Sequence, residues 1–143
     1  VLGAEGDLVL EAEPPDQVVD ARLHRRGRIL VEALGHCAEC HTPRNPLGGM
    51  DRARWMAGAP SGAQGDATPN ITPDEETGLG RWSAEELVDY LETGMDPDGD
   101  FAGSSMAEII DHSTGKLSAG DRAAIAAYLR SVPAIQHKNS SSR

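Results

Sequence analysis

Apolar residues recur at helical spacing near the start of the chain, between residues 18 and 35. Arg and Glu separate the apolar positions, which are Val19, Leu23, Leu30, Val31 and Leu34. This spacing predicts an amphipathic helix with one buried face. Gly27 lies on the same face, at a cost of about 1 kcal/mol relative to Ala, and this makes sense where a second helix crosses closely. A glycine that is merely tolerated is the alternative.

A second helix is predicted over residues 84–93. Ser83 and Glu86 have the spacing of a capping box, in which each residue satisfies a backbone N–H of the other. Leu87, Val88 and Leu91 follow on one face. Gly94 is a typical C-terminal stop.

Two further helices are predicted towards the C-terminus. The first is short and runs from Met106 to His112, and the second begins after Ser118 and ends before Pro133. No alternating pattern typical of a strand occurs, so the predicted fold class is all-α. We expect a surface arm at 1–16, one domain at 17–135 and a flexible polar tail at 136–143.

The segment 42–82 shows no periodic pattern and contains seven Gly and five Pro. A stretch of this length without secondary structure is unusual in a compact domain unless it wraps something. Leu, Ile, Val and Phe together form only about 18% of the 143 residues, which is low for an apolar core. Either part of the chain is disordered, or another group fills its centre.

Charge and hydropathy exclude two classes of function. The net charge of −10 argues against nucleic-acid binding, which needs an excess of Lys and Arg. No apolar window is long enough to span a membrane. The N-terminus lacks the features of a signal peptide, so we expect that any targeting segment has already been removed.

The charge is unevenly distributed along the chain. Residues 21–56 contain seven basic side chains and three acids, whereas residues 57–111 contain one basic side chain and thirteen acids. If these segments lie on different faces, the molecule has a strong electric dipole. The acids at 74–76 and 96–100 superficially resemble a calcium cluster, but their spacing does not match an EF-hand loop, which favours a solvated acidic face.

The two cysteines of the chain form the motif Cys37-Ala38-Glu39-Cys40-His41. C-x-x-C-H is the attachment sequence of c-type haem. At this spacing both thiols reach vinyl groups of one porphyrin, and the adjacent imidazole becomes an axial ligand of the iron. A buried porphyrin would also supply the missing apolar bulk. One motif and no further cysteine predict one covalent haem.

The motif has three other possible interpretations. A disulfide would close too small a loop to stabilise much, and a thioredoxin-like pair requires a strand that is not predicted here. A zinc site using His36, Cys37, Cys40 and His41 would compress four ligands into six residues, which is too tight for ordinary tetrahedral geometry. Haem attachment is therefore favoured.

In three stretches the sequence resembles class I c-type cytochromes, in particular the cytochrome domains and subunits of bacterial periplasmic alcohol and sugar-acid dehydrogenases. The stretches are Gly35 to Asn45, Asn70 to Ser83 (with the segments NITPD and TGLGRWS), and Ala123 to Ser131. The resemblance implies helices folded around one haem. It also implies that Gly27 and Tyr128 mark the crossing of the first and last helices.

The second axial ligand must come from the methionines or the remaining histidines. Met106 follows a pliable Gly-Ser-Ser segment and matches the ligand position of similar cytochromes, so it is preferred. Met95 and His112 are the alternatives. Met50 and Met56 follow His41 so closely that they would return on the same side of the haem, and a core role for Met106 remains a further alternative.

Three residues are predicted to contact the haem or its ligand. Asn70 and Trp82 match positions at the haem edge of similar proteins, where an amide or indole N–H donates to a propionate. Trp82 as core filling is the alternative. Pro43 or Pro46 is expected to place its carbonyl against the free N–H of His41, unless both are simple loop prolines.

The resemblance implies a single-electron carrier in the periplasm, without catalytic residues of its own. It would accept electrons from a dehydrogenase and pass them to a respiratory acceptor, as a monomer or weakly associated subunit. A fixed cytochrome subunit of a dehydrogenase is an alternative. A haem sensor or enzyme with a displaceable sixth ligand is another, and a well-placed Met106 argues against it.

Overall fold

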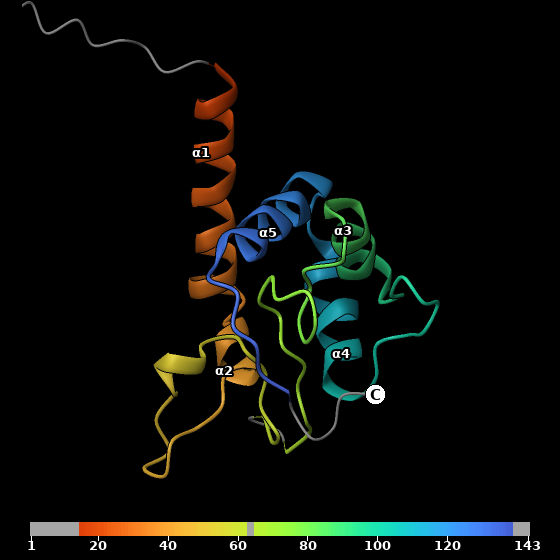
Figure 1. The fold of residues 1–143 in the computed structure, drawn as a ribbon. Helices are drawn as coiled ribbons and strands as arrows, with labels where there is room; N and C mark the ends of the chain where they lie inside the picture. Colours follow the sequence, from red (N-terminus) through yellow and green to blue (C-terminus); the bar gives the residue numbers. More distant parts are fainter. Residues whose placement is uncertain (1–14, 63–64, 139–143) are drawn as a thin grey trace, which may run out of the picture.

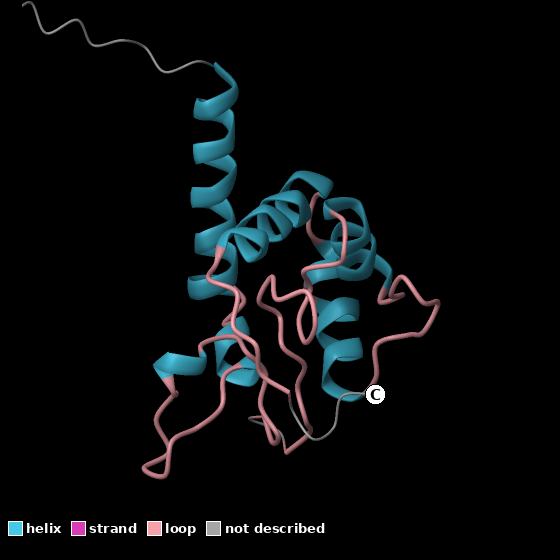
Figure 2. Ribbon diagram, in the orientation of Figure 1, coloured by secondary structure: helices cyan, strands magenta, loops and turns pink. Residues whose placement is uncertain are grey.

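The computed structural model describes residues 15–62 and 65–138. Within these ranges the fold is all-α, as predicted, with three isolated β-bridges and no strand. Helices surround a lower region built of loops (Figures 1 and 2). In chain order the elements are α1 (Pro15–Arg28), the π-helix η1 (Ile29–Leu34), α2 (Cys37–His41), the 3₁₀-helix η2 (Arg52–Arg54), α3 (Ala84–Thr93), α4 (Ser104–His112), the 3₁₀-helix η3 (Thr114–Lys116) and α5 (Ala119–Ser131).

The first predicted helix ends in a different helical form. Its α-helical part is continued by η1, where the Gly35 N–H donates to the Leu30 carbonyl over 2.7 Å. A π turn holds more residues than an α turn, so side chains after it no longer follow α-helical spacing. Leu30 and Val31 are buried, but Leu34 is 69% exposed. The prediction that Leu34 belongs to the buried face is therefore wrong.

Gly27 lies where α1 and α5 cross, as the resemblance implied. A Cβ atom at Gly27 would lie 2.0 Å from the carbonyl oxygen of Ala124 and 2.7 Å from the Cβ of Tyr128. Only a residue without a side chain allows the two helices to approach this closely. The Tyr128 hydroxyl donates to the carboxylate of Glu32, which adds a polar contact between η1 and α5.

The hydrophobic core follows from this crossing. Its buried residues come mainly from the first and last helices, with Met56 and Leu91 added from the loop and from α3; they are Leu30, Val31, Met56, Leu91, Ala124, Ile125, Tyr128, Leu129 and Val132. Val31 and Met56 have no exposed surface. The core thus lies beside the loop region rather than inside it.

Helix α3 has the predicted bounds, and its start has the predicted capping box. The Ser83 hydroxyl accepts from the Glu86 N–H over 3.1 Å, and the Ser83 N–H donates to the Glu86 carboxylate over 2.8 Å. Gly94 ends the helix with φ 80°. Arg122 of α5 is 5% exposed and pairs with Glu92 over 2.9 Å, which fixes α3 against α5.

The structure describes only parts of the predicted arm and tail. Residues 1–14 of the predicted arm lie outside the described residues, and Pro15 already belongs to α1. At the other end, residues 139–143 of the predicted tail lie outside the description. Gln136 donates to Glu76 over 2.6 Å, and the His137 N–H donates to Thr77 over 3.0 Å. The hydrogen bonds of the domain therefore extend to His137.

The helix crossing yields a stability prediction. Replacing Gly27→Ala should lower the free energy of unfolding by about 1–3 kcal/mol or more, because the new methyl group overlaps the α5 backbone. Gly120→Ala is the matched control, since its Cβ would meet only the Ser118 hydroxyl at 3.8 Å, and alanine there should be neutral or stabilising by up to about 1 kcal/mol. Denaturant unfolding of the haem-loaded protein measures both. Equal stability of the two variants would contradict the close crossing.

Candidate functional site

The C-x-x-C-H motif forms a short helix of its own. The chain leaves η1 at Gly35, turns through His36 in the left-handed conformation (φ 50°) and enters α2. Positions i, i+3 and i+4 of a helix share one face. Cys37, Cys40 and His41 therefore project from the same side of α2.

His41 is held by a backbone carbonyl from the long loop. His41 is buried, with 9% of its surface exposed. Its Nδ1 atom lies 2.8 Å from the Pro69 oxygen. A carbonyl only accepts, so Nδ1 carries the hydrogen and Nε2 keeps its lone pair, as an iron ligand requires. Burial lowers the pKa of His41, which favours the neutral ring.

The source of this carbonyl differs from the prediction. Neither Pro43 nor Pro46 supplies it, and the Pro43 carbonyl instead accepts from the Asp51 N–H over 2.8 Å. The expected second contact of His41 is thus real, but it comes from Pro69, 28 residues along the chain. No local spacing in the sequence indicates that pairing.

Both cysteines are free thiols and half-buried. Burial raises the pKa of Cys37 to about 11, so this thiol is protonated at neutral pH. A Cβ at Gly35 would lie 2.8 Å from the Leu30 carbonyl oxygen, so a residue without a side chain allows the tight turn from η1 to the motif. The structure contains no disulfide between Cys37 and Cys40.

The Gly- and Pro-rich loop wraps α2 with hydrogen bonds. The Thr68 hydroxyl donates to the Cys40 carbonyl over 2.6 Å, and the Gly58 N–H donates to the His41 carbonyl over 2.7 Å. Ala59 and Thr68 pair in an isolated bridge. Two separate parts of the loop, at Gly58 and at Thr68, therefore hold the C-terminal end of α2.

Met106 lies in the first turn of α4 and is half-buried. The neighbouring Ser105 hydroxyl donates to Asp66 over 3.1 Å. Asp66 belongs to the same loop that holds Cys40 through Thr68. The start of α4 and the motif helix are thus attached to one loop.

The other methionines have different surroundings. Met56 is completely buried and belongs to the hydrophobic core, and Met95 is 47% exposed in a turn after α3. His112 is exposed at the end of α4. Met50 is half-buried like Met106 and pairs with Arg44 in a bridge of the loop that follows His41. Met106 therefore stays the predicted ligand.

Asn70 has a different role from the one predicted. Its amide donates to Thr77 over 3.0 Å and to the Ile135 carbonyl over 2.7 Å, while its oxygen accepts from the N–H and hydroxyl of Thr72 over 2.9 and 2.7 Å. Both amide hydrogens are used within the protein, so none is free for a propionate. Asn70, 4% exposed, instead fastens the loop to the C-terminal segment.

Trp82 remains a candidate for the haem edge. Its ring is half-buried and packs edge-on against Tyr90, with centroids 5.4 Å apart. The Trp82 carbonyl accepts from Arg130 of α5 over 2.5 Å. This contact fixes the backbone before α3 and leaves the indole role as a prediction.

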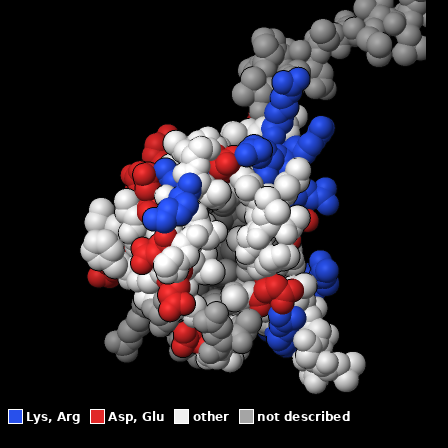
Figure 3. All heavy atoms as spheres, turned by 180° about the vertical axis from the view of Figure 1, so that it is seen from behind, with Lys and Arg blue, Asp and Glu red and all other residues white. Residues whose placement is uncertain are grey.

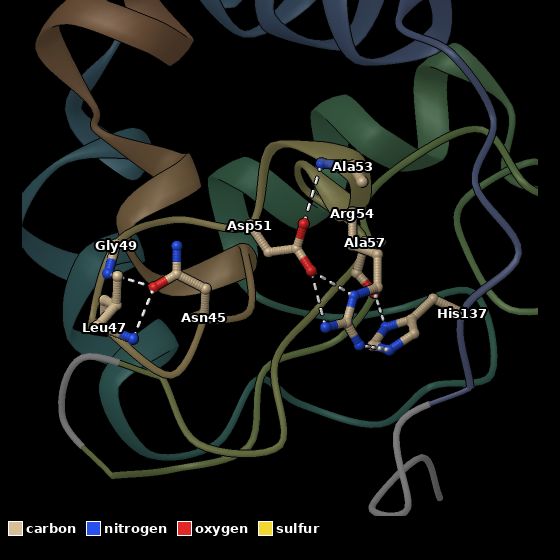
Figure 4. Close-up of polar contacts among 8 residues, drawn as sticks. All are labelled: Asn45, Leu47, Gly49, Asp51, Ala53, Arg54, Ala57 and His137. Carbon is tan, nitrogen blue, oxygen red and sulfur yellow. Dashed lines mark hydrogen bonds and ion pairs between the residues drawn. The ribbon is translucent and has the colours of Figure 1, made fainter.

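A polar cluster that the sequence analysis missed lies beside the motif loop (Figure 4). Arg54 pairs with Asp51 over 2.8 Å, and this hydrogen bond holds the pKa of Asp51 below its usual value. His137 bonds the Ala57 carbonyl over 2.9 Å and lies 3.4 Å from Arg54.

In the adjacent turn, Asn45 accepts from the N–H groups of Leu47 and Gly49.

These residues fit a covalently attached haem. Two thiols and a buried imidazole with a free Nε2 share one face, and a half-buried thioether is attached to the same loop. Several apolar side chains around the core are only partly buried, as a bound porphyrin would require; they are Cys37, Ala38, Trp55, Ile71, Leu79 and Leu117. Among the described residues, no helix is long and apolar enough to cross a membrane.

Comparison with known proteins agrees with this site. The chain is 48% identical over 132 residues to a protein named diheme cytochrome c-type from Cereibacter sphaeroides, which covers 92% of this chain and 39% of that protein. The chain belongs to the c-type cytochromes. This cytochrome c domain is also 48% identical over 109 residues to the fructose dehydrogenase cytochrome subunit of Gluconobacter japonicus (76% of this chain, 22% of that subunit).

A third relative of the cytochrome domain is the gluconate 2-dehydrogenase cytochrome c subunit of Pantoea cypripedii. It is 38% identical over 115 residues, which cover 76% of this chain and 26% of the relative. The chain thus spans less than two fifths of the length of each of these relatives. No family model matches it. The homology confirms the class I cytochrome c fold and a cytochrome c electron-carrier domain.

Proposed function

We propose that the domain carries single electrons on one haem c, attached through thioethers to Cys37 and Cys40, with His41 and Met106 as axial ligands. The observation that supports this most directly is the common face of the two thiols and the imidazole on α2. The haem supplies one-electron redox chemistry when it is bound. The protein residues hold it, orient its ligands and restrict the access of water.

The contacts of His41 favour an axial ligand of fixed orientation. The Pro69 carbonyl fixes which nitrogen carries the hydrogen, and burial favours the neutral ring. A thioether from Met106 would raise the reduction potential relative to a second imidazole. Trp82, which is half-buried, remains a predicted contact of the haem edge.

We infer that the domain works in the periplasm, between a dehydrogenase as donor and a respiratory protein as acceptor. The support is its likeness to two dehydrogenase cytochrome subunits. A fixed subunit is a second candidate, because two of the relatives are named as cytochrome subunits of dehydrogenases. The size of the native assembly, by light scattering after gentle purification, separates a fixed subunit from a free carrier.

A haem sensor or enzyme would need a readily displaced sixth ligand, which the partial burial of Met106 disfavours.

The charge distribution supports electrostatic docking of a redox partner. All three acids of residues 21–56 are neutralised in ion pairs, namely Glu32 with Arg28, Glu39 with Arg44 and Asp51 with Arg54. Among the acids of residues 57–111, Glu92 alone forms an ion pair with a described residue. Figure 3 shows blue side chains gathered on the side of α1, whereas red side chains are more frequent on the opposite side, with a few blue ones among them. We propose that the acidic side near Met106 attracts a basic patch on a partner.

Covalent attachment predicts one additional haem mass on the denatured chain. Mass spectrometry of the holoprotein should show it, and acid-acetone extraction should leave the haem on the chain. Cys40→Ala should yield mostly unfolded protein, because the haem, which fills the centre of the domain, then loses one of its two covalent bonds and is poorly retained. A haem that is extracted from the wild-type chain would contradict thioether attachment.

Ligation by Met106 predicts a weak far-red sulfur-to-iron band in the oxidised protein. Met106→Ala should remove this band and lower the reduction potential, because the thioether is lost. Met95→Ala is the matched control, since its side chain is 47% exposed in a turn, and it should keep both properties. The assignment is wrong if the Met95 variant loses the band and the Met106 variant keeps it.

Electrostatic docking predicts that salt slows electron transfer. The second-order rate with the dehydrogenase donor should fall as ionic strength rises to physiological values, because exposed charges are screened beyond about 8–10 Å. Stopped-flow reduction of the haem at several salt concentrations measures this rate. A rate that stays constant or rises would exclude the acidic side from docking.

A further inference from the structure

A groove of about 220 Å³ lies along α1 and η1. The residues that line it are Arg22, Arg25, Arg26, Ile29, Leu30 and Leu34. Its apolar part is accessible, because Ile29 is 51% and Leu34 69% exposed. We call this surface the basic groove. Exposed apolar side chains inside a charged rim are typical of protein-contact surfaces.

The backbone itself creates the apolar part of the basic groove. Regular α-helical spacing would place Leu34 on the buried face with Leu30 and Val31. The π turn, closed by the bond from the Gly35 N–H to the Leu30 carbonyl, changes this spacing and leaves Leu34 outside the core. Such turns within helices are frequent at functional sites.

The rim of the basic groove keeps positive charge that the described residues do not neutralise. Arg26 pairs with Asp121 of α5, but neither Arg22 nor Arg25 forms an ion pair with a described residue. Both side chains are exposed. The occupant of the groove should therefore present carboxylates around an apolar side chain.

The same chain carries a surface of that chemistry in the turn after α3. Met95 and Phe101 pair in an antiparallel bridge, so their side chains share one face, and they are 47% and 73% exposed. Three acids, Asp96, Asp98 and Asp100, occupy the turn between them. We call residues 94–102 the acidic hairpin.

The acidic hairpin is preorganised by its own hydrogen bonds. The Asp96 N–H donates to the Asp100 carbonyl over 2.8 Å, and the Asp96 carboxylate accepts from the N–H groups of Asp98 and Asp100 over 3.0 and 2.9 Å. Neither Asp98 nor Asp100 pairs with a described cation. The hairpin thus presents an apolar pair and free negative charge without a further cost of ordering.

The two surfaces lie on opposite sides of the molecule, with α1 at one edge and the turn after α3 at the other (Figure 1). They cannot meet within one molecule. We propose that the basic groove binds the acidic hairpin of a second copy of this cytochrome domain, in a head-to-tail contact. Engineered apolar cavities of about 150 Å³ bind benzene, so a groove of about 220 Å³ has room for the Phe101 ring.

This contact would place the haem sites of two copies next to each other. That consequence rests on the proposed function. Leu34 in the groove is three residues from Cys37, and the hairpin leads through Gly103 into α4, which carries Met106. The cysteine side of one copy would therefore face the methionine side of the next. Because the contact joins two different surfaces, copies would add in a row rather than as a symmetric pair.

Net charge determines the conditions of the test. Copies of charge −10 repel one another, but at about 0.1 M salt this repulsion is screened beyond about 10 Å, whereas contacts at shorter range persist. Sedimentation equilibrium of the holoprotein at this salt concentration, from micromolar to millimolar protein, should show a mean mass that rises with concentration.

Two charge-reversed variants test the two surfaces separately. The groove variant carries Arg22→Glu and Arg25→Glu, and the hairpin variant carries Asp98→Arg and Asp100→Arg. Each alone should associate at least about tenfold more weakly than the wild type, because like charges then meet in the contact. The hairpin variant is decisive, since its lower net negative charge would strengthen any non-specific association.

An equal mixture of the two variants should associate again, because the groove variant keeps its acidic hairpin and the hairpin variant keeps its basic groove. The reversed groove of one variant and the reversed hairpin of the other also carry opposite charges, so both contacts between the two variants are attractive. The mixture has the mean charge of the wild type, so net charge does not explain its recovery. The matched controls are Arg52→Glu with Arg81→Glu, and Glu75→Arg with Glu85→Arg; each changes charge equally outside both surfaces and should leave wild-type association intact.

Apolar variants keep the test valid if a charge-reversed variant misfolds, which circular dichroism and the haem spectrum would reveal. Phe101→Ser and Leu34→Ser should each weaken association, whereas Leu47→Ser, at a 96% exposed position elsewhere, should not.

The proposal is overturned if the wild type stays monomeric, if the hairpin variant associates like the wild type, or if the mixture associates no better than its components. Loss of haem would show separately in the spectrum and mass, so a failure of the proposed function is distinguishable.

Discussion

The hydrogen bond from His41 to the Pro69 carbonyl is the contact on which the site depends. It joins a one-turn helix to a loop that returns 28 residues later. The motif by itself fixes the order of two thiols and an imidazole, but not the direction of the ring. The loop supplies that direction, and bonds to the Cys40 and His41 carbonyls hold the same loop against α2. The long segment without secondary structure is therefore a structural part of the site.

A second constraint acts at the helix crossing. Gly27 allows α1 to contact the α5 backbone, and the buried residues of η1 and α5 then form most of the core. This core lies beside the motif, which leaves the region around α2 to loops and partly buried apolar side chains. A small chain with few large apolar residues can be stable in this arrangement only if another group occupies that region.

Much of this fold was predictable because its signals are local. The capping box and Gly94 fixed the ends of α3, and Gly27 on a helical face indicated a close crossing, which the resemblance to class I cytochromes assigned to the last helix. The C-x-x-C-H motif identified the site from five adjacent residues. The π turn was missed because regular spacing assigns Leu34 to the core, and one additional residue per turn reverses that assignment. The partners of His41 and Asn70 were missed because they are distant in sequence and are set by loop packing.

The fastening of the loop by the C-terminal segment has a consequence for the order of folding. Asn70 and Thr72 bond Ile135 across more than 60 residues, and His137 bonds the Ala57 carbonyl across 80. Contacts of such large sequence separation form late, because the intervening chain must first lose its freedom. During synthesis from the N-terminus, the motif and both thiols therefore emerge long before the residues that lock the loop around them. The cysteines remain accessible for chemical attachment throughout that interval, and the last few residues of the domain then close the structure.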